Sequence, residues 1–119
     1  MLGMRRVGKR IAQRLFVKPT QKDLRYTFVR RWARNDKQAY LQSMDAIMQW
    51  SVADRLGHID VPTLLISSDE DYTQAPAQRA HRGSNAELTV VDDARHALPA
   101  EKPSAFHEVV DAFLTRLGQ

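Results

Sequence analysis

Two short polar segments of the sequence hold the side chains that could do chemistry together. They contain Asp69, Glu70 and Asp71 in the first, and Asp92, Asp93 and His96 in the second. A carboxylate beside an imidazole fixes the tautomer of the ring and stabilises its protonated form, so that the ring can take a proton from a nucleophile. Asp71 and His96 therefore have the residue types of the acid and the general base of a hydrolytic triad.

Each polar segment directly follows a short apolar run. Residues 61–66 and 88–91 are too short for helices and rich in β-branched side chains, which predicts two buried strands. Between them, residues 75–81 predict a short helix. Strand, helix and strand form a βαβ unit, whose strands are parallel. Because parallel strands end at one edge of a sheet, we expect Asp71 and His96 at that same edge, where open α/β sheets bind ligands.

Helices are predicted on both sides of this unit. Three amphipathic helices precede it, and the first has Val7, Ile11 and Leu15 at four-residue spacing. After the second strand, Pro103 marks the start of a final helix. Its apolar residues follow the helical period: Phe106, Val109, Val110, Phe113, Leu114 and Leu117. Two parallel strands are too few for a stable sheet, so the pattern is typical of the end of a larger α/β fold.

Composition limits the classes of protein to consider. The chain has 119 residues, enough for one domain or part of one, and no cysteine. Disulfides and thiolate metal sites are therefore excluded, which fits a reducing compartment such as the cytoplasm. No apolar run is long enough to span a membrane, and the N-terminal arginines lack the apolar region of a secretory signal. We expect a cytoplasmic protein.

Charge is distributed unevenly along the chain. Residues 1–35 carry eleven Lys or Arg against Asp23 alone, whereas the remainder is acidic. Such a segment can bind nucleic acid or an anionic membrane. It lacks a recognised DNA-binding motif, however, and Phe28 and Trp32 lie on the helix face that requires burial. We therefore favour a solvated surface and expect no nucleic acid and no membrane as partners. Nucleic-acid binding stays a third possibility, which predicts steeply salt-dependent binding.

Adjacent carboxylates can also indicate a metal site. Asp69, Glu70 and Asp71 share one loop, but no histidine stands at ligand spacing from them. A solvated turn is the more common arrangement for such a group. Asp71 and His96 taken singly are likewise more often structural residues, and their joint placement after two strands is what favours a triad. We expect no metal and no cofactor.

The sequence from residue 59 onward resembles the C-terminal part of the α/β-hydrolase family. Ile59-Asp60-Val61-Pro62-Thr63-Leu64-Leu65-Ile66, with Asp71 five residues on, resembles the penultimate strand and acid loop of these enzymes. The last strand, histidine loop and C-terminal helix are matched by Asp92 to His96, Leu98, Glu101, Pro103 and Phe106. The helices upstream, with Arg30-Arg31-Trp32, Tyr40 and Trp50, look like the end of the cap over the active site.

The resemblance implies a serine-type hydrolase, with Asp71 as the acid and His96 as the general base. The family's nucleophile motif, G-x-S-x-G, is absent from this chain, and so is an H-G oxyanion motif. Two smaller departures lie beside the implied site. Ser68 replaces the usual glycine before the acid, and Arg95 replaces the usual glycine before the histidine.

These observations predict an α/β fold: the C-terminal part of an α/β-hydrolase, with a helical cap-like segment at 1–57 and an α/β core segment at 58–119. The predicted function is ester or amide hydrolysis through Asp71 and His96, with a small-molecule substrate. The serine must come from an N-terminal half, so the chain alone is expected to be inactive. The alternative is a non-catalytic fragment that binds a partner or forms a homo-oligomer through an exposed sheet edge and apolar helix faces.

Overall fold

A computed structural model gives the fold of the protein and describes residues 3–71 and 85–119. The chain divides into two compact units, Met1–Ser51 and Val52–Gln119, which are described separately below. The helix predicted at residues 75–81 lies outside the described residues. Within the described ranges, no helix combines the length and apolar character needed to cross a membrane.

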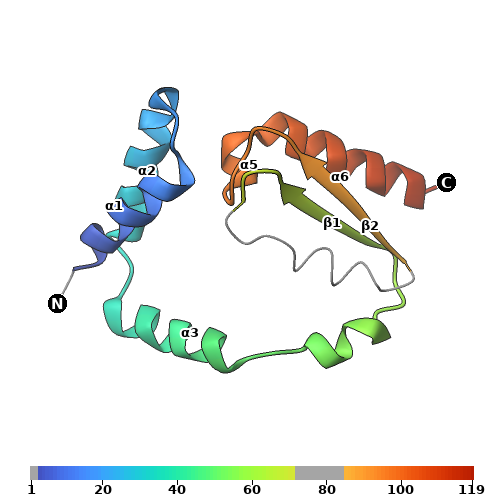
Figure 1. The fold of residues 1–119 in the computed structure, drawn as a ribbon, viewed down its shortest axis with the longest axis horizontal. Helices are drawn as coiled ribbons and strands as arrows, with labels where there is room; N and C mark the ends of the chain where they lie inside the picture. Colours follow the sequence, from blue (N-terminus) through green and yellow to red (C-terminus); the bar gives the residue numbers. More distant parts are fainter. Residues whose placement is uncertain (1–2, 72–84) are drawn as a thin grey trace. The chain divides into compact units, whose positions relative to one another are not determined.

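The first unit is helical, as the amphipathic patterns predict (Figure 1). Its elements are α1 (Met4–Leu15), a short 3-10 helix η1 (Pro19–Gln21), α2 (Lys22–Trp32) and α3 (Lys37–Gln49). Asp36 caps the N-terminus of α3, because its Oδ1 accepts the backbone N–H of Ala39 at 2.8 Å and so satisfies one of the free donors of the first turn.

The core of this unit forms where α1 packs on α2. The buried residues of α1 are Met4, Gly8, Ala12 and Leu15, and Phe16 follows directly, with 2% of its surface exposed. Of the predicted stripe, Leu15 is buried, whereas Val7 and Ile11 are partly buried beside the fully buried row. The reason is steric: Gly8 and Ala12 have small side chains, so the backbone of α2 can approach α1 on their side.

Gly8 allows α1 and α2 to approach closely, because it has no Cβ atom. A Cβ atom at this position would lie 2.7 Å from Cβ of Trp32, and that atom cannot swing aside because it is attached to the backbone of α2. Trp32 is itself held by Phe28, whose ring stacks on it with centroids 4.9 Å apart.

We therefore expect Gly8→Ala to destabilise the protein, although alanine is the better helix former. The helical gain is about 1 kcal/mol, whereas overpacking a tight contact costs about 1–3 kcal/mol. Urea unfolding followed by circular dichroism measures the difference. Gly57→Ala is the matched control, since no atom lies within 4 Å of a Cβ built there. A Gly8→Ala variant more stable than the parent would contradict the packing argument.

The second unit contains a small parallel sheet with helices after it (Figure 1). Its elements are η2 (Ala53–His58), β1 (Thr63–Ser68), β2 (Ala86–Val91), α5 (Leu98–Glu101) and α6 (Pro103–Leu117). The two predicted strands and their parallel pairing are confirmed, with Thr63 opposite Ala86 and Ser68 opposite Val91. Their bounds differ from the predicted 61–66 and 88–91, since β1 begins and ends two residues later and β2 begins two residues earlier. Both strands thus end at the same edge, as the two arrowheads in Figure 1 show.

Helix α6 begins at Pro103, as predicted, and packs along β2. The apolar side chain of Phe113 is buried, and the guanidinium of Arg116 donates a 2.6 Å hydrogen bond to Glu87 Oε2 on the strand. The end of the predicted apolar stripe is not covered by the described residues, since Leu114 and Leu117 are exposed. This helix fixes the strand from which the histidine-bearing loop leaves.

Candidate active site

The candidate site consists of two loops that leave the sheet at one edge. We call residues 68–71 the acid loop and residues 92–96 the histidine loop. Because Ser68 and Val91 are partners in the strand register, the two loops begin side by side. The ladder continues by one bond beyond the strands, from the N–H of Asp69 to the carbonyl oxygen of Val91 at 3.2 Å. The parallel pairing therefore places the two loops in contact.

Asp71 and His96 meet between these loops. His96 Nδ1 lies 3.2 Å from Oδ1 and 3.1 Å from Oδ2 of Asp71, so the ring faces both carboxylate oxygens. The side chain of Asp71 is 15% exposed and that of His96 is 48% exposed. A mostly covered carboxylate thus holds an imidazole that is half open to solvent.

The contact defines the chemistry of the imidazole. An ionised carboxylate has only acceptors, so the hydrogen of the pair lies on Nδ1 of His96, which donates to Asp71. In that tautomer Nε2 carries the lone pair that can accept a proton. An imidazole oriented in this way has the geometry required of a general base.

The first turn of the histidine loop is held by Lys102, the residue directly before α6. Asp93 has a φ of 56°, in the left-handed region that aspartate enters more readily than most residues. Lys102 Nζ donates to the carbonyl oxygen of Asp92 at 3.1 Å and to Asp93 Oδ2 at 3.3 Å. The turn directs Ala94, which is 1% exposed, into the interior. Asp92 and Asp93 therefore contribute to a turn that Lys102 holds in place.

Asp69 accepts hydrogen bonds from the histidine loop. Backbone N–H groups of Asp93 and then of Ala94 lower the pKa of its carboxyl below the ordinary value of an aspartate, because they stabilise the ionised form. One of these bonds runs from the N–H of Ala94 to Oδ1 of Asp69 at 3.3 Å. The carboxylate is thus part of the contact between the loops, although it is exposed to solvent.

This shift predicts a dependence of stability on acid pH. The folded pKa lies below the unfolded value, so the unfolded state binds the proton more readily. The stabilisation is present above the unfolded pKa and is lost as the pH falls through the folded pKa. We expect the melting temperature of the parent to fall more than that of Asp69→Asn as the pH is lowered from about 6 to about 2. Parallel melting curves for the two proteins would contradict this.

The remaining residues of the predicted loops make local contacts. Glu70 Oε2 lies 3.3 Å from Nε of Arg95, an ion pair by distance in which the N–H is not directed well enough to count as a hydrogen bond. In the part of the chain that the structure describes, no group of three or more His, Asp or Glu side chains is arranged to hold a metal ion.

Sequence reasoning did not predict the residues that join the loops. Ser68 donates its hydroxyl to the carbonyl oxygen of Arg95 at 2.8 Å, and the N–H of Arg95 donates to Oε1 of Glu101 at 2.9 Å. The available signal was that Ser68 and Arg95 stand where the resembling family has glycines. In the sequence these are two separate departures, and the structure joins them through the bond of Ser68 to Arg95.

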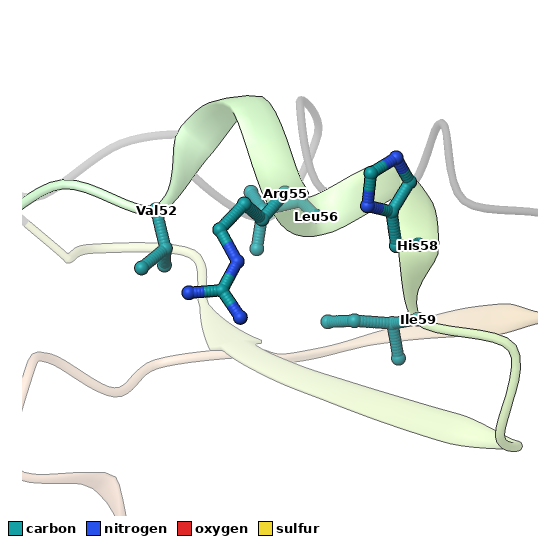
Figure 2. Close-up of a pocket in the computed structure, with 5 residues that line it drawn as sticks. All are labelled: Val52, Arg55, Leu56, His58 and Ile59. Atoms are coloured by element: carbon teal, nitrogen blue, oxygen red, sulfur yellow. The ribbon is translucent and has the colours of Figure 1, made fainter.

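A second feature of this unit is a surface hollow of about 320 Å³ beside η2 (Figure 2). It is lined by Val52, Arg55, Leu56, His58 and Ile59. Figure 2 shows Arg55 extending between Val52 and Ile59, while the ring of His58 points the other way. The lining comes from one short segment, so the hollow is a surface depression, and we assign no substrate to it.

Comparison with solved structures identifies the fold. The chain superposes on the enol-lactonase from Burkholderia xenovorans LB400 with a TM-score of 0.84 and 24% identity, over 95% of this chain and 45% of that one. It superposes on a hydrolase from Pseudomonas aeruginosa PA01 with a TM-score of 0.82 and 21% identity, over 96% of this chain and 45% of that one. No protein-family model and no curated protein matches the sequence.

The chain therefore has the fold of the C-terminal portion of an α/β-hydrolase, as its sequence predicts. It spans less than half the length of the two hydrolases that it matches. At these identities the comparison establishes the fold alone. The roles of Asp71 and His96 have to be argued from their geometry and tested by experiment.

Proposed function

We propose that this chain is the C-terminal part of a serine-type hydrolase that cleaves esters or amides. In this proposal Asp71 orients His96, and His96 acts as the general base. The observation that carries it is the contact of Nδ1 of His96 with both carboxylate oxygens of Asp71, at the carboxyl edge of a parallel pair of strands. An enol-lactonase acts on a lactone, which is a cyclic ester, and this supports the ester as substrate class.

The nucleophile in this proposal belongs to a second segment. No serine of the chain has glycines at the offsets of G-x-S-x-G, so a segment with that motif has to meet the carboxyl edge of the sheet. Residues 1–57 then contribute the end of a cap and residues 58–119 the end of the core. The absence of cysteine supports the cytoplasm as the place of action.

Complementation tests the proposal directly. The chain is mixed with the N-terminal portion of the Burkholderia enol-lactonase that lies outside the superposed region, and hydrolysis of a p-nitrophenyl ester is followed. We expect activity above that of either part alone. Size-exclusion chromatography establishes whether a complex forms, and a single-chain fusion of the two parts replaces the mixture if it does not. A folded fusion that hydrolyses no ester would count against the proposal.

A second candidate function, partner binding without catalysis, is favoured by exposed apolar side chains. In the first unit, Ile47, Met48 and Trp50, at the end of α3, are 63%, 81% and 70% exposed. Apolar side chains grouped on a surface indicate an interaction site. If association is the function, light scattering at increasing concentration should show oligomers, and His96→Ala should leave them intact. A monomer at all concentrations would contradict self-association.

A further inference from the structure

Three consecutive residues of the acid loop contact the histidine loop directly before His96. The hydroxyl of Ser68 donates to the carbonyl oxygen of Arg95 at 2.8 Å. The carboxylate of Asp69 accepts the N–H of Ala94 at 3.3 Å. The N–H of Glu70 in turn donates to the carbonyl oxygen of Ala94 at 3.1 Å. The histidine loop is thus bound at the two residues that precede His96.

These contacts and the Asp71–His96 contact close a small ring. The chain runs from Ser68 to Asp71, crosses to His96, goes back to Arg95 and returns through the Ser68 hydroxyl. The ring includes only a few residues. If the bond of Ser68 to Arg95 is lost, the histidine loop can therefore rotate about the remaining contact of His96 with Asp71. The hydroxyl of Ser68 and the carboxylate of Asp71 both belong to the acid loop, so they move together relative to His96.

The side chains suit this task to different degrees. Ser68 is 7% exposed, and its hydroxyl is the group that reaches the peptide next to His96. Asp69 is exposed, yet its ionised carboxylate accepts hydrogen bonds from backbone N–H groups of the histidine loop. Hydrogen bonds to an ionised acceptor are stronger than those to a neutral one. The ion pair of Glu70 with Arg95 is partly exposed on both sides and is expected to contribute little.

We propose that Ser68 and Asp69 are positioning residues, which hold the histidine loop so that Nδ1 of His96 stays on Asp71. The inference rests on the proposed function, because positioning matters only if His96 acts as a base. Residue 68 is a serine here, and its hydroxyl makes a bond to Arg95 that a glycine could not make.

The test measures the tautomer of His96, which a merely structural role would not move. Nitrogen-15 NMR of the 119-residue chain above neutral pH gives the ratio of the Nδ1–H to the Nε2–H form of each histidine ring. In Ser68→Ala and in Asp69→Ala we expect this ratio for His96 to fall roughly fivefold, the factor that one hydrogen bond contributes. His107, on α6, serves as the internal reference in each spectrum.

Two conservative variants complete the design. Asp69→Asn keeps an oxygen that can accept from Ala94, so it should restore most of the parent ratio. Glu87→Gln weakens the contact of β2 with Arg116 on α6, away from the two loops, and should leave the ratio unchanged. Amide spectra of α6 report in each case whether the second unit is still folded.

The outcomes separate this inference from the proposed function. A lowered ratio in both alanine variants, with α6 folded and Asp69→Asn restored, supports positioning. An unchanged ratio overturns it, and so does loss of the whole fold, since the bonds would then maintain the sheet itself. Because the ratio is measured without a substrate, a lowered ratio in a chain whose fusion hydrolyses no ester would support the positioning and contradict the hydrolase.

Discussion

Replacing His96 by alanine should reduce ester hydrolysis by the complemented chain on the order of 10⁵-fold or more, the loss that follows removal of the base from a serine triad. The reason is that a serine hydroxyl attacks a carbonyl only when a base takes its proton, and His96 is the imidazole that Asp71 holds at the sheet edge. The loss should appear in kcat, with KM nearly unchanged, since the ring reacts in the transition state.

His107→Ala is the matched control for this experiment. His107 is exposed on α6 and makes a ring contact with Phe106, so its removal should leave the rate within about twofold of the parent. Added imidazole should restore part of the activity of His96→Ala, because the truncated side chain leaves space beside Asp71. A His96→Ala enzyme that keeps a tenth of the parent rate would exclude His96 as the base.

Such a test is possible because the sequence predicted which two side chains would meet. Each of the short apolar runs was long enough only for a strand, and parallel pairing then placed both following loops at one edge. The contact between Asp71 and His96 follows from this topology and needs no detail of side-chain packing. What the contact does in catalysis stays a prediction, which the rate of the His96→Ala variant tests.

The packing of α1 was less predictable. Hydrophobic periodicity selects large apolar residues, so it selected Val7 and Ile11, whereas the helix buries Gly8 and Ala12 against α2. Glycine and alanine contribute little to a hydrophobic pattern, so the pattern does not indicate whether they are buried. The requirement for a close approach becomes visible only when Trp32 is seen opposite Gly8.

The bonds between the loops were also beyond the sequence. Ser68 and Arg95 are 27 residues apart, and their bond joins a side chain to a backbone carbonyl, whose acceptor is the same for every residue type. No residue pattern encodes such a partner. The departures from glycine at these two positions indicated that this part of the chain is unusual. The structure shows why, because the two residues are joined by a hydrogen bond.

Asp71→Asn should reduce hydrolysis by the complemented chain on the order of 10⁴-fold while leaving the fold intact. Asparagine has the shape of aspartate, but its amide nitrogen donates where the carboxylate accepted. If that amide faces Nδ1 of His96, the ring has to accept there and carry its hydrogen on Nε2. An Nε2–H group cannot take the proton of the serine. The effect is smaller than that of His96→Ala because the imidazole itself remains.

Measuring both the hydrolysis rate and the His96 tautomer on the same variant separates the possible roles of Asp71. In Asp71→Asn the ratio of Nδ1–H to Nε2–H forms of His96 should invert, and the rate should fall with it. Asp60→Asn, an exposed aspartate that precedes β1 at the opposite end of the sheet, is the matched control and should change neither quantity. A fallen rate with an unchanged tautomer would mean that Asp71 acts by its charge on the protonated ring rather than by orienting the neutral one. If neither the rate nor the tautomer changes, Asp71 is only a turn residue, and the acid of the triad must be sought elsewhere.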